Sequence, residues 1–145
     1  MFTKKTIRDI DLQGKTVLLR ADYNVPLNAE GDIADDYRIQ QSLPTVQYLL
    51  DHHAKVIICS HLGRPKGPDD ASASLFPVAK RLQKLLKRQV DFVPDCVGPR
   101  AEKAAASLRQ GSVALLENLR YHPEEEKNDD DFAKQLAGLA DVFVQ

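Results

Sequence analysis

Charged and polar side chains follow three short apolar runs of the sequence, at the point where each run ends. They are Asp22 and Asn24 after 16–19, His61 and Arg64 after 55–59, and Arg120 after 113–116. Guanidinium groups present fork-shaped donors that match pairs of carboxylate or phosphate oxygens, and an imidazole adds a further donor. Asp22 and Asn24 would project to the same side of an extended segment and could hold a hydroxyl group. This set favours recognition of a small, multiply charged anion.

The stretch CSHLGRPKG at 59–67 concentrates such donors in one loop. Gly63 permits a tight bend and Pro65 stiffens the chain, so the loop would be preorganised. The net charge of the whole chain is only −1, which excludes binding of nucleic acid or another polyanion through bulk electrostatics. Anion recognition by this chain must therefore be local.

Several other charged residues have a simpler structural interpretation. Arg20 could pair with a carboxylate at the edge of the core, and His122, which precedes a proline, is typical of a turn. His52 and His53 close a predicted helix, where they would complement its dipole. The acidic stretch 124–131 is expected to be a solvated loop with acids at a helix N-terminus, and we assign it no function.

Five apolar runs predict strands, and the amphipathic patterns between them predict helices. The strands are expected at 16–19, 55–59, 89–93, 113–116 and 141–144. The helices are expected around 43–50 with Pro44 in the first turn, from an N-cap at Ser74 to Leu86, around 101–108 with Gly111 as the end, and around 132–140. The alternation predicts an α/β fold, a doubly wound parallel sheet with helices on both faces in a Rossmann-like three-layer arrangement. Ligands of such sheets bind beyond the carboxyl ends of the strands, where the polar residues lie.

The sequence also disfavours several kinds of site. The tripeptide at 14–16 resembles the end of a P-loop, but Asp9 stands where the first Gly is needed, and no GxGxxG turn occurs. A nucleotide-binding loop and a dinucleotide-binding oxidoreductase are therefore disfavoured. Cys59 and Cys96 have no metal-ligand spacing, so we expect no metal site and a reducing, cytoplasmic location. A signal peptide and a membrane span are not expected either.

Five segments together resemble the N-terminal half of phosphoglycerate kinase. They are RADYNVPL (20–27), DDYRIQQSLPT (35–45), SHLGRPKG (60–67), DCVGP (95–99) and LLENLRYHPEEE (115–126). They occur in the order of the family over nearly the whole chain, and SHLGRPKG and LLENLR are the most specific. Departures within the segments are small: Ala21 and Tyr23 stand where the family often has Val and Phe, and Tyr37 precedes Arg38.

The resemblance implies the glycolytic reaction that moves a phosphoryl group between 1,3-bisphosphoglycerate with ADP and 3-phosphoglycerate with MgATP. It implies that 1–145 is part of an N-terminal domain that binds phosphoglycerate, and that a C-terminal domain outside this chain binds the nucleotide. By position, the substrate-binding residues would be Asp22 and Asn24 for the glycerate, His61, Arg64 and Arg120 for the 3-phosphate, and Arg38 for the carboxylate. Arg38 would also be the catalytic residue that stabilises the phosphoryl group in transfer.

The last residue of the chain is Gln145, where the family continues into a further phosphate-binding loop, a hinge and the nucleotide domain. We therefore expect a truncated kinase, with a sheet that is incomplete at the C-terminal end, that is inactive alone. Its full-length parent would be a monomer, whereas the truncated chain could self-associate through an uncovered sheet edge. The alternative is a non-catalytic anion-binding or scaffolding module derived from the kinase half.

Overall fold

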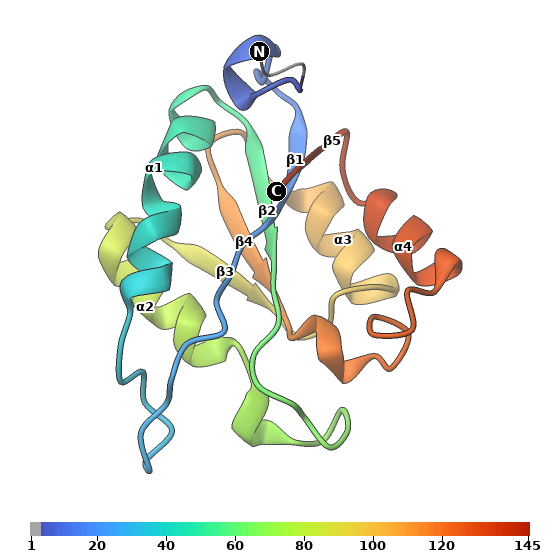
Figure 1. Cartoon of the computed structure of the whole chain (residues 1–145). Coiled ribbons are helices and arrows are strands. Elements are labelled where there is room, and N and C mark those ends of the chain that lie inside the picture. The colour runs from blue at the N-terminus through green and yellow to red at the C-terminus, as the bar shows by residue number, and fades with distance from the viewer. Residues whose placement is uncertain (1–3) are drawn as a thin grey trace.

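Five parallel strands form the central sheet of the computed structural model, which describes residues 4–145 (Figure 1). They are β1 (Thr16–Arg20), β2 (Lys55–Cys59), β3 (Val90–Val93), β4 (Val113–Leu116) and β5 (Val142–Val144). Their order in the sheet is β3-β4-β2-β1-β5, and every neighbouring pair is parallel. The predicted strands are confirmed, with boundaries that differ by one residue at most.

Four α-helices of the described residues connect the strands. They are α1 (Tyr37–Asp51), α2 (Phe76–Leu86), α3 (Pro99–Ser107) and α4 (Asp130–Ala137), with short 3₁₀ helices η1 (Ile7–Asp9), η2 (Ala71–Ala73) and η3 (Leu119–Tyr121). Helices α1 and α2 pack on one face of the sheet and α3 and α4 on the other, which is the predicted doubly wound, three-layer α/β fold (Figure 1). No helix within 4–145 is both long and apolar enough to cross a membrane.

The sheet divides the apolar core into two clusters. Neighbouring residues of one strand point to opposite clusters, because successive side chains of a strand alternate between the faces. Leu19 and Ile58 pack towards α1 and α2, whereas Leu18 and Ile57 pack towards α3 and α4. Since both faces are covered, the central strands are apolar throughout, and the sequence shows continuous runs in place of alternation.

The first helix differs from the prediction, which placed Pro44 in its first turn. Helix α1 begins already at Tyr37, so Pro44 lies in its interior. A proline there removes a helical hydrogen bond and costs about 3 kcal/mol. The added turns bury Ile39 completely, which contributes about 1.5–3 kcal/mol. They also place the Ser42 hydroxyl 2.8 Å from the hydroxyl of Tyr23, a hydrogen bond that contributes about 1 kcal/mol. These gains offset the proline, and its exposed ring disturbs no core packing.

The other three helices also differ from the prediction at a boundary, and α4 ends at Ala137, short of the predicted 140. Ser74 is not the N-cap of α2, because the helix begins at Phe76 and Leu75 occupies the cap position. The Ser74 hydroxyl still accepts a hydrogen bond from the amide of Phe76 at 3.2 Å, and it donates to Glu117 at 2.7 Å. Helix α3 ends at Ser107 and does not extend to Gly111, which lies with φ +76° in the turn before β4.

Candidate functional site

The loops that follow β1, β2 and β4 are joined by hydrogen bonds at the carboxyl edge of the sheet. The amide of Tyr23 donates to Ser60 Oγ at 3.0 Å, and the amide of Gly63 donates to Asn24 Oδ1 at 2.8 Å. The amide of Leu119 donates to the carbonyl oxygen of Ser60 at 3.0 Å. The loops that carry the predicted anion-binding residues therefore form one connected surface.

Asn118 connects the second of these loops to the third. Its side chain is completely buried and makes four hydrogen bonds. Nδ2 donates to the carbonyl oxygens of Leu62 and Ala73, both at 2.8 Å. Oδ1 accepts from the amide of Arg120 at 3.0 Å and from the amide of Leu62 at 3.3 Å. Sequence reasoning missed this residue, because a buried asparagine has no periodic pattern and only its position in LLENLR marks it.

Arg38, from the first turn of α1, contacts both polar residues of the first loop. Its Nη1 donates to the carbonyl oxygen of Asn24 at 2.7 Å and to Asp22 Oδ1 at 3.2 Å. Arg38 and Asp22 also line a cavity of about 410 Å³ that reaches Arg20 and Val144 at the ends of β1 and β5. Strand position alone did not select Arg38, since it lies on a helix, and the family resemblance was the only signal for it.

Glu125 bridges two arginines of the site. Arg20 Nη2 donates to Glu125 Oε1 at 2.8 Å, so Arg20 pairs with a carboxylate, as its structural interpretation predicted. Arg120 Nε lies 3.4 Å from Glu125 Oε2 and 3.5 Å from Glu126 Oε1, which is longer than an ordinary hydrogen bond. That nitrogen is buried and has no hydrogen-bond partner within 4–145. The prediction of a solvated loop for the acidic stretch is therefore wrong for Glu125, whose side chain is only 11% exposed.

Burial and a neighbouring positive charge lower the pKa of the His61 imidazole. Burial lowers the pKa of His61 below its usual value of 6.5, and the positive charge of Arg120 lowers it further. Glu125 opposes this effect but does not outweigh it. For Glu125 itself, burial pushes the pKa upward, and the hydrogen bond and charge of Arg20 outweigh burial and lower it. The site thus combines a neutral imidazole, two guanidinium groups and one carboxylate.

Arg64 stands apart from the other predicted residues. It is exposed, and among the described residues no hydrogen bond or ion pair reaches its guanidinium group. Its neighbour Gly63 has φ +57°, the bend that the sequence predicted at this position. The loop therefore presents Arg64 to solvent next to the connected surface.

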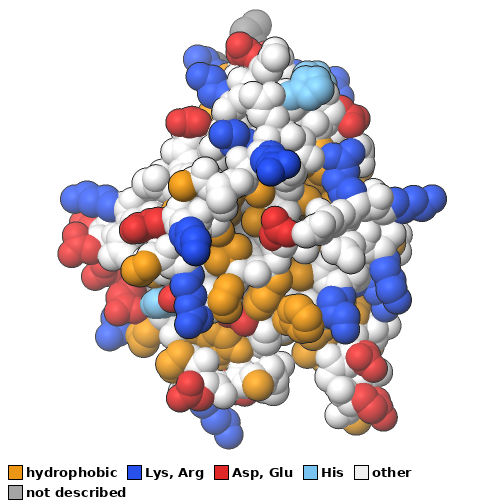
Figure 2. Space-filling view, turned by 180° about the vertical axis from the view of Figure 1, so that it is seen from behind, with side chains coloured by type: hydrophobic (Ala, Val, Ile, Leu, Met, Phe, Trp, Pro, Cys, Tyr) orange, Lys and Arg blue, Asp and Glu red, His pale blue; other side chains and the backbone are white. Residues whose placement is uncertain are grey.

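Two of the other hollows are less suited to a small anion. A groove of about 750 Å³ between α2 and β3 is lined by Lys80, Lys84, Lys87 and Arg88 together with Phe76 and Phe92. Figure 2 shows a face on which hydrophobic side chains gather at the middle, with Lys, Arg, Asp and Glu side chains around them. Flexible lysines with few fixed polar partners are a poorer anion clamp than arginines held by loops.

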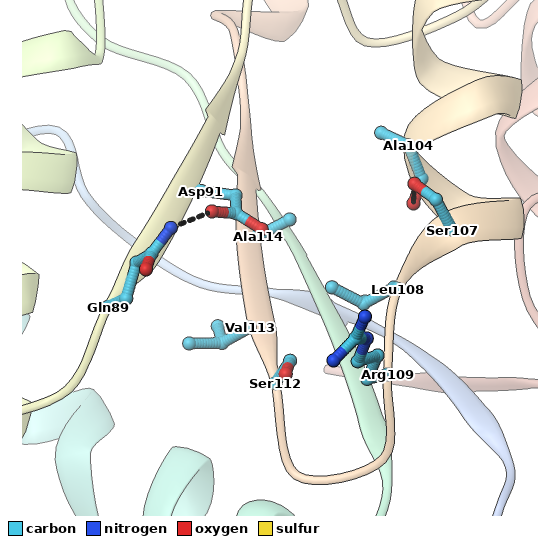
Figure 3. Close-up of a pocket in the computed structure, with 9 residues that line it drawn as sticks. All are labelled: Gln89, Asp91, Ala104, Ser107, Leu108, Arg109, Ser112, Val113 and Ala114. Carbon is cyan, nitrogen blue, oxygen red and sulfur yellow. Dashed lines mark hydrogen bonds between the residues drawn. The ribbon is translucent and has the colours of Figure 1, made fainter.

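The second hollow, of about 350 Å³, lies at the amino ends of β3 and β4 (Figure 3). Gln89 donates to Asp91 at 2.8 Å across its rim, and Arg109 approaches from the end of α3. In open α/β sheets ligands bind at the opposite, carboxyl edge. The connected surface at that edge is therefore the candidate functional site.

Known proteins resemble this chain along nearly its whole length. The family model described as "Phosphoglycerate kinase" matches residues 7–145. A phosphoglycerate kinase of Moorella thermoacetica is 60% identical over 141 residues, which make up 97% of this chain and 36% of that protein. A phosphoglycerate kinase of Aquifex aeolicus is 55% identical over 144 residues, 99% of this chain and 36% of that protein.

A solved structure shares the fold as well. The crystal structure of phosphoglycerate kinase from Pyrococcus horikoshii OT3 superimposes with a TM-score of 0.85 at 33% sequence identity. The match covers 94% of this chain and 35% of that one. The chain thus spans 36% of the length of the two curated relatives named above.

Proposed function

Because the chain belongs to the phosphoglycerate kinase family, we propose that it forms part of the phosphoglycerate-binding domain of a glycolytic kinase. That kinase transfers a phosphoryl group reversibly between 1,3-bisphosphoglycerate and ADP, with 3-phosphoglycerate and ATP as the products. Residues 1–145 supply the phosphoglycerate side of this reaction, in the cytoplasm.

The observation that carries the proposal is the incomplete pairing of Arg120. Its Nε is hidden from solvent, and the carboxylates nearest to it lie 3.4 and 3.5 Å away. A buried donor without a hydrogen bond costs about 1–3 kcal/mol. A small rotation of this guanidinium towards a ligand oxygen relieves that cost, because no short hydrogen bond of Nε has to be broken first. The arrangement is therefore suited to accept an anion.

We assign the 3-phosphate to Arg120, His61 and Arg64. Charge-assisted hydrogen bonds contribute about 1.5–3 kcal/mol each, so these residues together supply micromolar affinity in a preorganised loop. The neutral imidazole of His61 donates one hydrogen bond, and it takes up a proton when the phosphate dianion arrives. Arg64 has no competing partner among the described residues and closes over the ligand from the solvent side.

We assign the glycerate to Asp22, Asn24 and Arg38. Arg38 already lies against both loop residues, at 2.7 Å from the carbonyl oxygen of Asn24 and 3.2 Å from Asp22 Oδ1. The guanidinium group of Arg38 is exposed, and its contact with the exposed carboxylate of Asp22 is an ion pair of the kind that contributes little. Arg38 can therefore turn to the substrate. Next to the reacting carboxyl group, Arg38 stabilises the negative charge of the phosphoryl group during transfer.

The nucleotide, MgATP or ADP, is the second substrate and is held by the rest of the enzyme. No Gly-rich phosphate loop occurs in the sequence. Phosphoryl transfer depends on alignment of the two substrates and on charge stabilisation more than on covalent help from the protein. This chain therefore aligns one substrate and does not catalyse the transfer alone.

Titration of the isotope-labelled protein with 3-phosphoglycerate tests the site by NMR. Amide signals of the 59–67 loop and of Arg120 should shift, and glycerate without the phosphate should shift them much less. Arg64→Ala and Arg120→Ala should each weaken binding by about 10- to 100-fold. The matched control Arg109→Ala, in the hollow at the opposite edge of the sheet, should leave the affinity unchanged.

The test can contradict the proposal in two ways. Shifts that cluster in the α2–β3 groove would assign anion binding to a different surface. If Arg64→Ala and Arg120→Ala bound 3-phosphoglycerate as tightly as the control Arg109→Ala, the assignment of the phosphate to these arginines would be wrong. A coupled kinase assay completes the test, since turnover by the purified chain at an ordinary kinase rate would contradict its predicted inactivity alone.

A further inference from the structure

Asp95, Cys96 and His122 bring a carboxylate, a thiol and an imidazole together beside the loops that follow β3 and β4. One ligand atom from each residue lies within 4.8 Å of the other two, and His122 Nε2 lies 2.8 Å from Asp95 Oδ1. Within 4–145, no other group of three His, Cys, Asp or Glu side chains meets this distance condition. None of the three belongs to the phosphoglycerate site, so the cluster needs its own explanation.

The exposure of the three side chains leaves one side of the cluster open. Cys96 is buried, with 1% of its surface exposed, whereas Asp95 and His122 are half-buried. Asp95 and His122 both line a cavity of about 360 Å³, which is also lined by Glu117 and Tyr121. A cation in the cluster would have protein ligands on its inner side and water on the cavity side. Three protein ligands and one open position are typical of zinc sites that bind water or substrate.

The three ligand atoms are of types that suit a cation. A carboxylate oxygen, a thiol sulfur and an imidazole nitrogen lie together, and a divalent cation would balance the carboxylate and stabilise the thiolate.

We propose that Asp95, Cys96 and His122 bind a divalent transition-metal cation of the zinc class through one carboxylate oxygen, Sγ and Nε2. A thiolate and an imidazole select such a cation over magnesium or calcium, which prefer oxygen ligands. Water from the cavity completes the four ligands. Binding releases the thiol proton to solvent, and the imidazole proton moves from Nε2 to Nδ1.

The observed distances need only small adjustments. Zinc bonds to these ligand types are about 2.0–2.3 Å long, so the ligand atoms of a tetrahedral site stand about 3.3–3.7 Å apart. The contact of 2.8 Å between Asp95 and His122 must open slightly, and the longest separation, at most 4.8 Å, must close. Both changes would have to come from rotations of the three side chains about their own bonds.

The simpler interpretation is a single hydrogen bond between His122 and Asp95, which contributes little where it is exposed. Two contacts favour preformed ligands over a mobile surface pair. Asp95 Oδ1 also accepts a hydrogen bond from the Cys96 amide at 2.7 Å. The His122 ring lies 5.4 Å from the ring of Phe132, centroid to centroid.

Titration of the purified, metal-free protein with Co²⁺ tests the proposal, because Co²⁺ replaces zinc and absorbs light. The expected result is a one-to-one complex with visible d–d bands and a thiolate-to-cobalt charge-transfer band, both removed by added Zn²⁺. Cys96→Ser should abolish the charge-transfer band. The matched control Cys59→Ser alters the other buried thiol and should keep both bands.

His122→Gln and Asp95→Asn test the remaining ligands without touching the buried thiol. Each should weaken Co²⁺ binding at least tenfold, and circular dichroism should show that both variants stay folded. The proposal would be overturned if the charge-transfer band persisted in Cys96→Ser. It would also be overturned if the affinity for Co²⁺ were unchanged in both His122→Gln and Asp95→Asn. The absence of any band in the folded, unaltered protein at millimolar Co²⁺ would overturn it as well.

Discussion

The side-chain oxygen of Asn24 accepts a hydrogen bond of 2.8 Å from the amide of Gly63, across the gap between two strand-end loops. The carbonyl oxygen of the same Asn24 accepts from Arg38 at 2.7 Å. One residue thus sets the distance between the loop that carries Arg64 and the helix that carries Arg38. The relative position of these two arginines therefore depends on the side-chain and main-chain oxygens of Asn24 and on the bend at Gly63.

Gly63→Ala should destabilise the protein by about 1–2 kcal/mol, because φ at this position is in the left-handed region, where L-residues are strained. The observed φ is +57°, and a Cβ would meet nothing within 4 Å, so backbone strain is the only cost. Urea unfolding monitored by circular dichroism measures the effect.

Gly67→Ala is the matched control for this substitution. Gly67 lies in the same loop, also has nothing within 4 Å of an added Cβ, and does not have a left-handed φ. Its replacement should be neutral or should stabilise the protein by about 0.4–1 kcal/mol through the unfolded state. Equal effects at 63 and 67 would contradict the role of the bend.

Asn118→Ala should destabilise the protein by about 2–4 kcal/mol, since it leaves buried carbonyl and amide groups of Leu62, Ala73 and Arg120 without partners. The side chain is 0% exposed, so water cannot replace the lost hydrogen bonds. Denaturant unfolding provides the measurement. Gln89→Ala, which removes an exposed amide, should change stability by less than about 0.5 kcal/mol. If Asn118→Ala lost no more stability than Gln89→Ala, contacts other than those of Asn118 would have to hold the loops together.

The fold was predictable because strand and helix alternate and each strand is an uninterrupted apolar run. The clustering of Asp22, Asn24, His61, Arg64 and Arg120 near one edge follows from that topology. Arg38 could not be found this way, since it lies in the first turn of a helix whose predicted start was near residue 43. Asn118 and Glu125 were missed for another reason: their partners are distant in sequence or on an irregular loop, and no local spacing encodes such contacts.

Phosphoglycerate binding should strengthen as the pH falls towards the pKa of His61. That pKa lies below 6.5 in the free protein, mainly through burial and then through Arg120. A bound phosphate dianion raises it, so binding takes up a proton. NMR titration of the imidazole signals, with and without 3-phosphoglycerate, measures both pKa values.

His61→Gln is the control for this prediction, because the phosphate of the ligand titrates itself near pH 6. The variant should retain only the pH dependence of the ligand. An identical pH profile for both proteins would exclude His61 from the phosphate site.

The same imidazole affects stability with a defined sign. The folded-state pKa of His61 is below the unfolded value of about 6.5, so the unfolded state binds more protons between these two values. Stability therefore rises with pH across this window and falls as the pH drops below about 6.5. His61→Gln should flatten this part of the stability profile, as measured by thermal unfolding at a series of pH values. A profile as steep as that of the unaltered protein would assign the dependence to other groups.

Glu125→Gln should destabilise the protein by about 1–2 kcal/mol, because it removes the charge that balances Arg20 and Arg120. The Glu125 side chain is 11% exposed, so solvent screens these interactions only partly. Urea unfolding measures the loss. Glu124→Gln, an exposed neighbour on the same loop, should change stability by less than about 0.5 kcal/mol. Equal losses for both variants would contradict the bridging role of Glu125.

Glu125 gives the proposed anion site a resident counter-ion, with one oxygen 2.8 Å from Arg20 and the other 3.4 Å from Arg120. A monovalent ion such as chloride offers these guanidinium groups no more charge than the carboxylate that they already contact. A phosphate dianion offers more charge and more acceptor oxygens, and it can draw Arg120 away. In the proposed site, the carboxylate would thus set a threshold of charge that discriminates against small monovalent anions.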